Sequence, residues 1–217
     1  MSSDAAAMKP LVPDDRYVAL IDILGWGAKV VADLPGTSIL YDTLLGLWRT
    51  ITDAYQGVAS IRIFSDSVLI VSKELAAVLQ SVNSLQFTAL ANDCLLRGGI
   101  AFGKHAEREQ DSQLHIVSVP LVLAARVEKT IRVPAIGIHE TAMPRFEYRE
   151  LLRIPVFQRS LLFFRNMWIV NPFNIMWGAS AGTRVQQLRE EHPEHRAKYE
   201  WFLDLYEAVK SGASLIP

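Results

Sequence analysis

The order of strand-like and helix-like segments predicts an α+β protein with a ferredoxin-like split βαβ core and a C-terminal helical extension. Three observations point to this fold class. They are a buried strand near the N-terminus, a hairpin of two short apolar strands, and two helices that separate these strands from each other and from a fourth. With 217 residues, half of them hydrophobic, the chain is long enough to form one sizeable core.

The strands are predicted from short apolar runs. The run YVALIDIL, residues 17–24, contains one acid and is typical of a strand buried on both faces. VASIRIF and SVLIVS, residues 58–64 and 67–72, flank Ser65-Asp66 and predict a tight hairpin. The glycines of CLLRGGIAFGK, residues 94–104, predict a bulge or a close backbone approach in the fourth strand. Further strands are expected at residues 133–139, 160–164 and 167–170.

Helices are predicted where apolar residues keep helical spacing. They cover residues 37–55, 74–92, the later part of 115–130, and 183–209. The last of these is interrupted at His192-Pro193, because proline removes a backbone donor from a helix. We expect residues 1–15 to be a flexible tail, residues 16–182 the main domain, and residues 183–217 a helical segment of that domain.

Composition excludes several classes of protein. The formal net charge is −1, which argues against a stable nucleic-acid binder, because phosphate neutralisation needs a basic face. No uninterrupted apolar run approaches the roughly 20 residues of a membrane-spanning helix. The polar, acidic N-terminus does not resemble a signal peptide. The single cysteine, Cys94, fits a reducing compartment, so we expect a cytoplasmic protein.

Two aspartates are the leading candidates for chemistry. Asp22 lies inside an apolar strand, where a carboxylate needs hydrogen-bond donors, an arginine or a metal ion. Asp66 lies at the hairpin tip, where aspartate is by itself an ordinary turn residue. In a split βαβ sheet the first strand and the hairpin are neighbours, so both acids approach each other. Their repulsion is relieved by a divalent cation with oxygen ligands.

The turn after the first strand lies beside this acidic pair. Its backbone N–H groups lead towards a helix and are suited to phosphate oxygens. A dinucleotide fingerprint is disfavoured, because Val30 stands where the third glycine belongs. Leu24 stands where a phosphatase of the haloacid-dehalogenase type needs a second aspartate. His192 and His195 have helical spacing for a metal, but a solvated helix face is the preferred interpretation.

Four segments resemble the class III nucleotidyl cyclases: VALIDILGWG, IRIFSDSVLIV, LRGGIAFG and QLHIVSVPLVLAARVEKT. The resemblance spans about residues 17–140 and implies the fold of that family's catalytic domain. It implies that Asp22 and Asp66 bind two divalent cations, Mn²⁺ or Mg²⁺, with help from the Ile23 carbonyl. It also implies that Arg126 stabilises the transferring phosphoryl group from across a homodimer interface, although a surface ion pair is the plainer interpretation of this arginine.

The resemblance implies that the turn over Leu24, Gly25, Trp26 and Gly27 holds the phosphates. The base pocket departs from the purine cyclases. Arg62 occupies the position of their purine-selecting lysine, and His115 that of their base-reading aspartate. An outward strand residue and an ordinary loop histidine are the alternatives.

Val122 replaces the asparagine that precedes the catalytic arginine in purine cyclases, so ribose positioning must differ. These departures are most similar to the pyrimidine cyclases of the Pycsar anti-phage systems. They imply conversion of UTP to cyclic UMP and pyrophosphate, with the product acting on a separate effector. The alternatives are cyclic CMP production from CTP, a degenerate homologue that binds nucleotide without turnover, and a structural partner or sensor.

Overall fold

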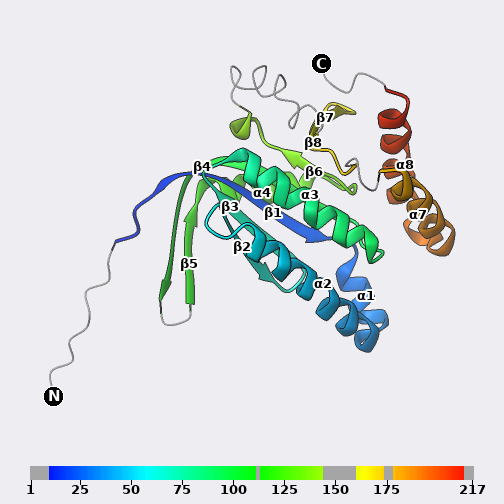
Figure 1. Ribbon diagram of the computed structural model, residues 1–217, viewed down its shortest axis with the longest axis horizontal. Helices are drawn as coiled ribbons and strands as arrows, with labels where there is room; N and C mark the ends of the chain where they lie inside the picture. Colours follow the sequence, from blue (N-terminus) through cyan, green and yellow to red (C-terminus); the bar gives the residue numbers. More distant parts are fainter. Residues whose placement is uncertain (1–9, 111–112, 144–159, 174–177, 213–217) are drawn as a thin grey trace.

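A computed structural model describes residues 10–110, 113–143, 160–173 and 178–212. It contains one mixed sheet with helices on both faces (Figure 1). The strands are β1 (Asp14–Ile23), β2 (Ala59–Phe64), β3 (Ser67–Ser72), β4 (Leu96–Gln110), β5 (Gln113–Ser118), β6 (Ile136–Ile138), β7 (Leu161–Phe164) and β8 (Met167–Val170). The α-helices are α1 (Trp26–Ala32), α2 (Leu34–Ala54), α3 (Leu75–Ala91), α4 (Val119–Thr130), α7 (Gly178–Glu191) and α8 (Arg196–Lys210). Two short 3-10 helices are η1 (Glu140–Ala142) and η2 (Pro193–His195).

The strand order confirms the predicted fold class. Hydrogen-bonded neighbours follow the order β2-β3-β1-β4-β6-β8-β7, and β1 is antiparallel to both β3 and β4. The first four strands of this order, with α1 and α2 between β1 and β2 and α3 between β3 and β4, form a split βαβ core. Strands β6, β8 and β7 extend the sheet beyond β4, and β6 is parallel to β4.

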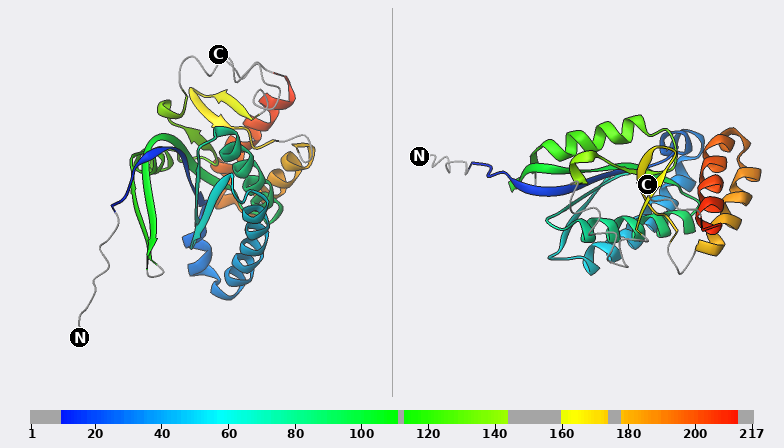
Figure 2. Two further views of the ribbon diagram at one scale, coloured as in Figure 1. Left: turned by 60° about the vertical axis from the view of Figure 1, so that its left-hand side comes forward. Right: turned by 90° about the horizontal axis from the view of Figure 1, so that it is seen from above.

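Alternation along β1 separates the two faces of the sheet. Ala19, Ile21 and Ile23 belong to the large core that includes residues of α2 and α3. Val18 belongs to a small cluster on the other face, with Leu121 of α4 packed against it. Figure 2 shows the same layers from above, with α4 over one face and α2 and α3 over the other. Asp22 shares the parity of Val18 and therefore points to the α4 face.

Two element boundaries differ from the expectation. We predicted a helix from residue 37, but α2 begins at Leu34 and includes the Pro35-Gly36 pair. Its first turn is stabilised by Asp33, whose Oδ1 accepts a hydrogen bond from the N–H of Gly36 at 3.1 Å. Proline is tolerated in a first helical turn because the N–H that it lacks has no helical acceptor there. The segment that begins at Trp26, for which no helix was predicted, forms helix α1.

The fourth strand is longer than predicted. It continues to Gln110 and pairs with β5, so that β4 and β5 project from the sheet as a two-stranded arm (Figure 1). The predicted strand ended near Lys104, because the charged residues beyond it carry no apolar alternation. β5 lies in the stretch that was expected to lead directly into the third helix.

The C-terminal elements form a second core. Residues of α7 and α8 pack together with residues of β7 and β8 and with Leu90 and Leu95. The predicted strands at 160–164 and 167–170 and the interruption at His192-Pro193 are confirmed. Residues 1–9 of the predicted tail, the aromatic-rich segment 144–159 and residues 213–217 lie outside the described part of the chain. Across the described helices, none combines the length and apolar character that crossing a membrane requires.

Candidate active site

The tip of the β2–β3 hairpin meets the end of β1. Asp22 is opposite Ser67 in the β1–β3 register, and the N–H of Ile23 donates to the carbonyl of Asp66 at 3.1 Å. The side chain of Asp22 is 19% exposed, and Asp66 is half-buried. The sequence-predicted pair of carboxylates is therefore brought to one edge of the sheet, as the split βαβ topology required.

Asp22 has an arginine partner that sequence reasoning did not assign. Arg97 lies directly opposite Asp22 in the β1–β4 register. Its Nε and Nη2 donate to Asp22 Oδ2 at 3.1 and 3.0 Å. Burial raises the pKa of Asp22 to about 6, the Arg97 hydrogen bond opposes this, and the charge of Asp66 adds to the increase. Arg97 therefore compensates part of the cost of placing a carboxylate here.

Glu128 of α4 completes a chain of three charged groups. Its Oε1 lies 2.8 Å from Arg97 Nε, and its side chain is only 12% exposed. The close approach of α4 to β4 depends on Gly99, because a Cβ at this position would lie 2.3 Å from the carbonyl oxygen of Ala124. This is the close backbone approach that the glycines of the fourth strand predicted. One signal for Arg97 was present in the sequence, since a carboxylate inside an apolar strand needs a partner.

The donor set at this edge fits a hard divalent cation. Asp22 and Asp66 offer carboxylate oxygens, and their mutual repulsion contributes to the raised pKa of Asp22. Among the described residues, no group of three or more histidine, cysteine, aspartate or glutamate side chains is placed to hold a metal ion. Mg²⁺ commonly binds through one or two carboxylates together with substrate phosphates. Asp22 and Asp66 are thus sufficient as protein ligands for a cation whose remaining ligands are the phosphates of a nucleotide.

The turn after β1 has the geometry of a helix start. Gly25 is the N-cap residue of α1 and has φ +82°, a conformation that glycine adopts without strain. The N–H of Leu24 already donates to the carbonyl of Leu95 at 2.8 Å, so it is used within the fold. Trp26 is buried and Gly27 is exposed. The N–H groups of the first helical turn have no helical acceptor, which leaves them suited to an anion.

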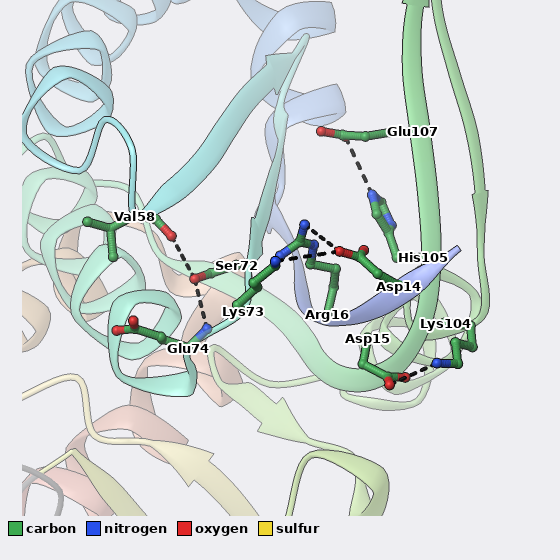
Figure 3. Close-up of polar contacts among 10 residues, drawn as sticks. All are labelled: Asp14, Asp15, Arg16, Val58, Ser72, Lys73, Glu74, Lys104, His105 and Glu107. Carbon is green, nitrogen blue, oxygen red and sulfur yellow. Dashed lines mark hydrogen bonds and ion pairs between the residues drawn. The ribbon is translucent and has the colours of Figure 1, made fainter. Parts of the chain in front are cut away.

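Arg62 lies among acids that the sequence analysis did not connect with it. Its Nη2 is 3.5 Å from Glu107 Oε1 and its Nη1 is 3.4 Å from Glu109 Oε2, both on the β4–β5 arm. Figure 3 shows His105 pointing towards Glu107, and the two side chains approach to 3.5 Å. His105 is buried, and neither of its ring nitrogens has a hydrogen bond within the described residues.

Glu107 also lines an open cavity of about 720 Å³. Figure 3 also shows Arg16 and Lys73 converging on Asp14, and the two ion pairs measure 2.6 and 3.9 Å. Arg16 and Lys73 line the same cavity. The printed partners of Arg62 are therefore acidic side chains of the β4–β5 arm, which the two-residue pocket predicted from the sequence did not include.

The predicted base-reading pair is not brought together within one chain. His115 is exposed on β5 and lies opposite Arg108 in the β4–β5 register. Side chains alternate along a strand, so His115 and Arg108 share one face of the arm while Glu107 and Glu109 share the other. Arg62 contacts the second face. In a single protomer, Arg62 and His115 therefore lie at opposite faces of the arm and are not placed to contact one base together.

Arg126 lies on the outer side of α4 and is exposed, in contrast to the inward-facing Glu128. Val119 and Val122 precede it at helical spacing and are 56% and 52% exposed. An apolar stripe that ends in an arginine is thus presented to solvent. His192 and His195 line a separate cavity of about 350 Å³ behind the Leu24 turn, and His192 Nδ1 lies 3.3 Å from Glu194.

No protein-family model matches the sequence, and no curated protein matches it. Solved structures, however, match the fold. An adenylate cyclase of Trypanosoma brucei in its monomeric state superposes with a TM-score of 0.56 at 17% identity, over 79% of this chain and 94% of that chain. The adenylyl cyclase CyaB from P. aeruginosa gives 0.53 at 14% identity, over 75% and 96%.

A non-canonical dimeric guanylyl cyclase domain of the RhoGC fusion protein from the aquatic fungus Blastocladiella emersonii gives a TM-score of 0.54 at 14% identity, over 76% and 98% of the two chains. The chain therefore has the fold of the class III adenylyl and guanylyl cyclase domains.

Proposed function

We propose that this protein is a nucleotide cyclase that converts UTP to 3′,5′-cyclic UMP and pyrophosphate. The observation that carries the proposal is the meeting of Asp22 and Asp66 at one edge of a cyclase-type sheet, with the Ile23 N–H and the Asp66 carbonyl 3.1 Å apart. Two half-buried carboxylates whose charges repel serve little structural purpose. They are well suited to a cation that carries a triphosphate.

In the proposed reaction, the ribose 3′-oxygen forms a bond to the α-phosphorus, and the bond from this phosphorus to the β-phosphate bridging oxygen breaks. The 3′-hydroxyl proton is lost to solvent, and pyrophosphate leaves. Asp22 and Asp66, with the Ile23 carbonyl, would hold two Mg²⁺ or Mn²⁺ ions, which supply charge neutralisation at the triphosphate. The protein's own task is to orient the triphosphate at the turn over Leu24–Gly27 and to exclude unproductive poses.

Arg126 is proposed to neutralise charge at the α-phosphate of the partner's site. Its exposure supports this role, because no described carboxylate forms an ion pair with it in its own chain. The exposed Val119 and Val122 beside it offer apolar area for a second copy of the chain. A two-fold symmetric homodimer would then contain two equivalent composite sites.

For the base, we propose that Arg62 and His115 take part in reading a pyrimidine. UTP is the proposed substrate and CTP the alternative, because an arginine and a histidine offer a different donor pattern from the lysine and aspartate of purine cyclases. The acids beside Arg62 add acceptor oxygens that a ring or amino N–H could meet. We propose from the sequence resemblance alone that the cyclic UMP product is a second messenger in cytoplasmic anti-phage defence. It would act on a separate effector protein.

The test is incubation of the full chain with each of the four nucleoside triphosphates and Mn²⁺, followed by identification of the products. We expect pyrophosphate and cyclic UMP from UTP. Cyclic CMP as the main product would support the alternative substrate. Binding of UTP without pyrophosphate release from any nucleotide would instead identify a degenerate homologue and contradict the catalytic proposal.

A further inference from the structure

The cavity of about 350 Å³ behind the turn that follows β1 lies between α1 and the start of α8. Figure 1 shows α1, α7 and α8 at the same end of the molecule, so the C-terminal helices close this cavity against the sheet domain. Its lining residues come from three segments: Leu24, Ala28, Lys29 and Ala32; Asp93 and Leu95; and His192, Glu194, His195, Lys198 and Tyr199. The volume is near the lower end of the range for small-molecule sites, which indicates a small ligand.

Four polar side chains of the cavity have no partner. Within the described residues, Lys29 and Lys198 form no ion pair or hydrogen bond, and neither do the imidazole of His195 and the hydroxyl of Tyr199. Both lysines and His195 are half-buried, and Tyr199 is 7% exposed. Burial raises the pKa of Tyr199 to about 12, so its hydroxyl stays protonated and able to donate at neutral pH. The cavity therefore offers several donors that a ligand can use.

The two acids of the cavity do have partners. Asp93 is neutralised by Arg184, whose Nε lies 2.6 Å from its Oδ1. Oε1 of Glu194 lies 3.3 Å from Nδ1 of His192. Even with the full charge of Glu194 set against them, the two lysines leave an excess of one positive charge, and His195 adds a second when it is protonated. This excess favours an anionic ligand.

The kind of donor indicates a phosphate group rather than a carboxylate. Arginine, whose planar fork matches a carboxylate, is missing from the described residues that line the cavity. Lysines act as point charges, and together with a ring N–H and a hydroxyl they suit the three oxygens of a phosphate monoester. The rest of the lining is apolar and is available to a small organic body: Leu24, Ala28, Ala32 and Leu95.

The cavity shares a wall with the turn proposed for the triphosphate, but it does not include the cation edge. Leu24 belongs to that turn, and a Cβ at Gly25 would lie 3.8 Å from Nε2 of His195. Asp22 and Asp66 are not among the described residues that line the cavity. A ligand here would contact the turn from behind while the two aspartates remain free.

We propose that this cavity is a second ligand site, which binds a small phosphate monoester through Lys29, His195, Lys198 and Tyr199. The site goes beyond the proposed function, because it requires neither a nucleotide nor a divalent cation. Its ligand would hold the C-terminal helices and α1 together, since the four side chains come from both.

The probe is phenyl phosphate, which joins a phosphate group to a small apolar body. Its binding to the full chain, without nucleotide or divalent cation, is measured by saturation-transfer NMR of the ring protons. Lys198→Gln removes one charge and should weaken binding by about 10-fold or more. Tyr199→Phe keeps the ring in the second core and removes only the hydroxyl, so about a 5-fold loss is expected. Lys210→Gln, at a site 63% exposed on the same helix, is the matched control and should keep full affinity.

Two further probes test the ligand class. Inorganic phosphate should compete with phenyl phosphate, and benzoate should bind more weakly because it lacks the tetrahedral group. The proposal is overturned if benzoate binds at least as tightly, or if millimolar phenyl phosphate shows no saturable binding. Equal affinities of folded Lys198→Gln and Lys210→Gln proteins, checked by their thermal midpoints, would also overturn it. A chain that forms no cyclic nucleotide would leave these results unchanged, so the two proposals fail separately.

Discussion

The two ends of the candidate site differ in how complete they are within one chain. At the cation end, Asp22, Arg97 and Glu128 are joined by contacts of 2.8 to 3.1 Å, and Asp66 is tied to β1 by a backbone hydrogen bond. At the base-reading end, Arg62 contacts acids at 3.4 and 3.5 Å, and His115 faces away from it. Arg126 is exposed on the outer side of α4.

This difference indicates which part of the proposed site is formed within a single protomer. The cation end is preorganised by a sheet register and by a packed helix, both of which form when the chain folds. The groups proposed for the base and the α-phosphate lie on an arm and on an exposed helix stripe, where a second chain can approach. Helix α4 serves both ends, since Glu128 faces inward and Arg126 outward.

The largest effect is expected at the cation end. Asp66→Asn removes the charge of one of the two proposed oxygen ligands, so we expect a loss of more than about 10³-fold in the rate of pyrophosphate release. Asp42→Asn, at an exposed position on α2, is the matched control and should keep full activity. If Asp66→Asn releases pyrophosphate as fast as Asp42→Asn does, Asp66 is not needed for the reaction and the proposed cation site is wrong.

Arg126→Ala is expected to lower kcat by about 10²–10³-fold, because it removes the charge stabilisation that we propose for the α-phosphate. The free energy of unfolding should change by less than about 0.5 kcal/mol, since the side chain is exposed and no described carboxylate pairs with it. Lys129→Ala, also exposed on α4, serves as the control. Initial rates at saturating nucleotide and a denaturant titration check the two parts separately.

The partly buried position of Asp22 should be visible as a dependence of stability on pH. Its pKa is raised from 3.8 to about 6 in the folded protein. The folded state therefore binds the proton more tightly, and this stabilisation is full below about pH 4 and lost as the pH rises through 6. Without metal, Asp22→Asn should increase the free energy of unfolding by up to about 3 kcal/mol at pH 8 and by little at pH 4. A destabilised variant at pH 8 would show that the Arg97 bond outweighs burial.

A smaller effect is expected at the base-reading end. Glu107→Gln removes the charge beside Arg62 and should change the ratio of kcat/KM values for UTP and CTP by about 10-fold, because the hydrogen-bonding surroundings of the base change. The more exposed Glu109→Gln should change it less. Competition between the two nucleotides in one reaction gives the ratio directly. If the ratio of kcat/KM values is unchanged in both variants, Glu107 and Glu109 do not take part in base selection.

Much of the core could be predicted from the sequence because its strands and helices carry strong apolar periodicity. The approach of Asp22 to Asp66 followed from the split βαβ order. The arm did not follow, because residues 104–110 are charged and resemble a loop when read without their partner strand. The start of α2 was misjudged because a Pro-Gly pair is compatible with both a break and a first helical turn.

The charged chain behind Asp22 was beyond sequence reasoning for a spatial reason. Arg97 and Glu128 are 31 positions apart, and their contact depends on how closely α4 approaches β4 at Gly99. The acids around Arg62 were missed because they lie on the unpredicted part of β4. In both cases the residues are visible in the sequence, but the distance between their elements is not.

The central claim is that one protomer supplies the cation end and its partner supplies the arginine. Mixing Asp66→Asn protein with Arg126→Ala protein, each inactive alone, tests it directly. If dimers re-form at random, half are mixed and each holds one intact site of two, so about a quarter of the wild-type rate of pyrophosphate release should return. A mixture that exchanges subunits and stays as inactive as its components would contradict the composite site.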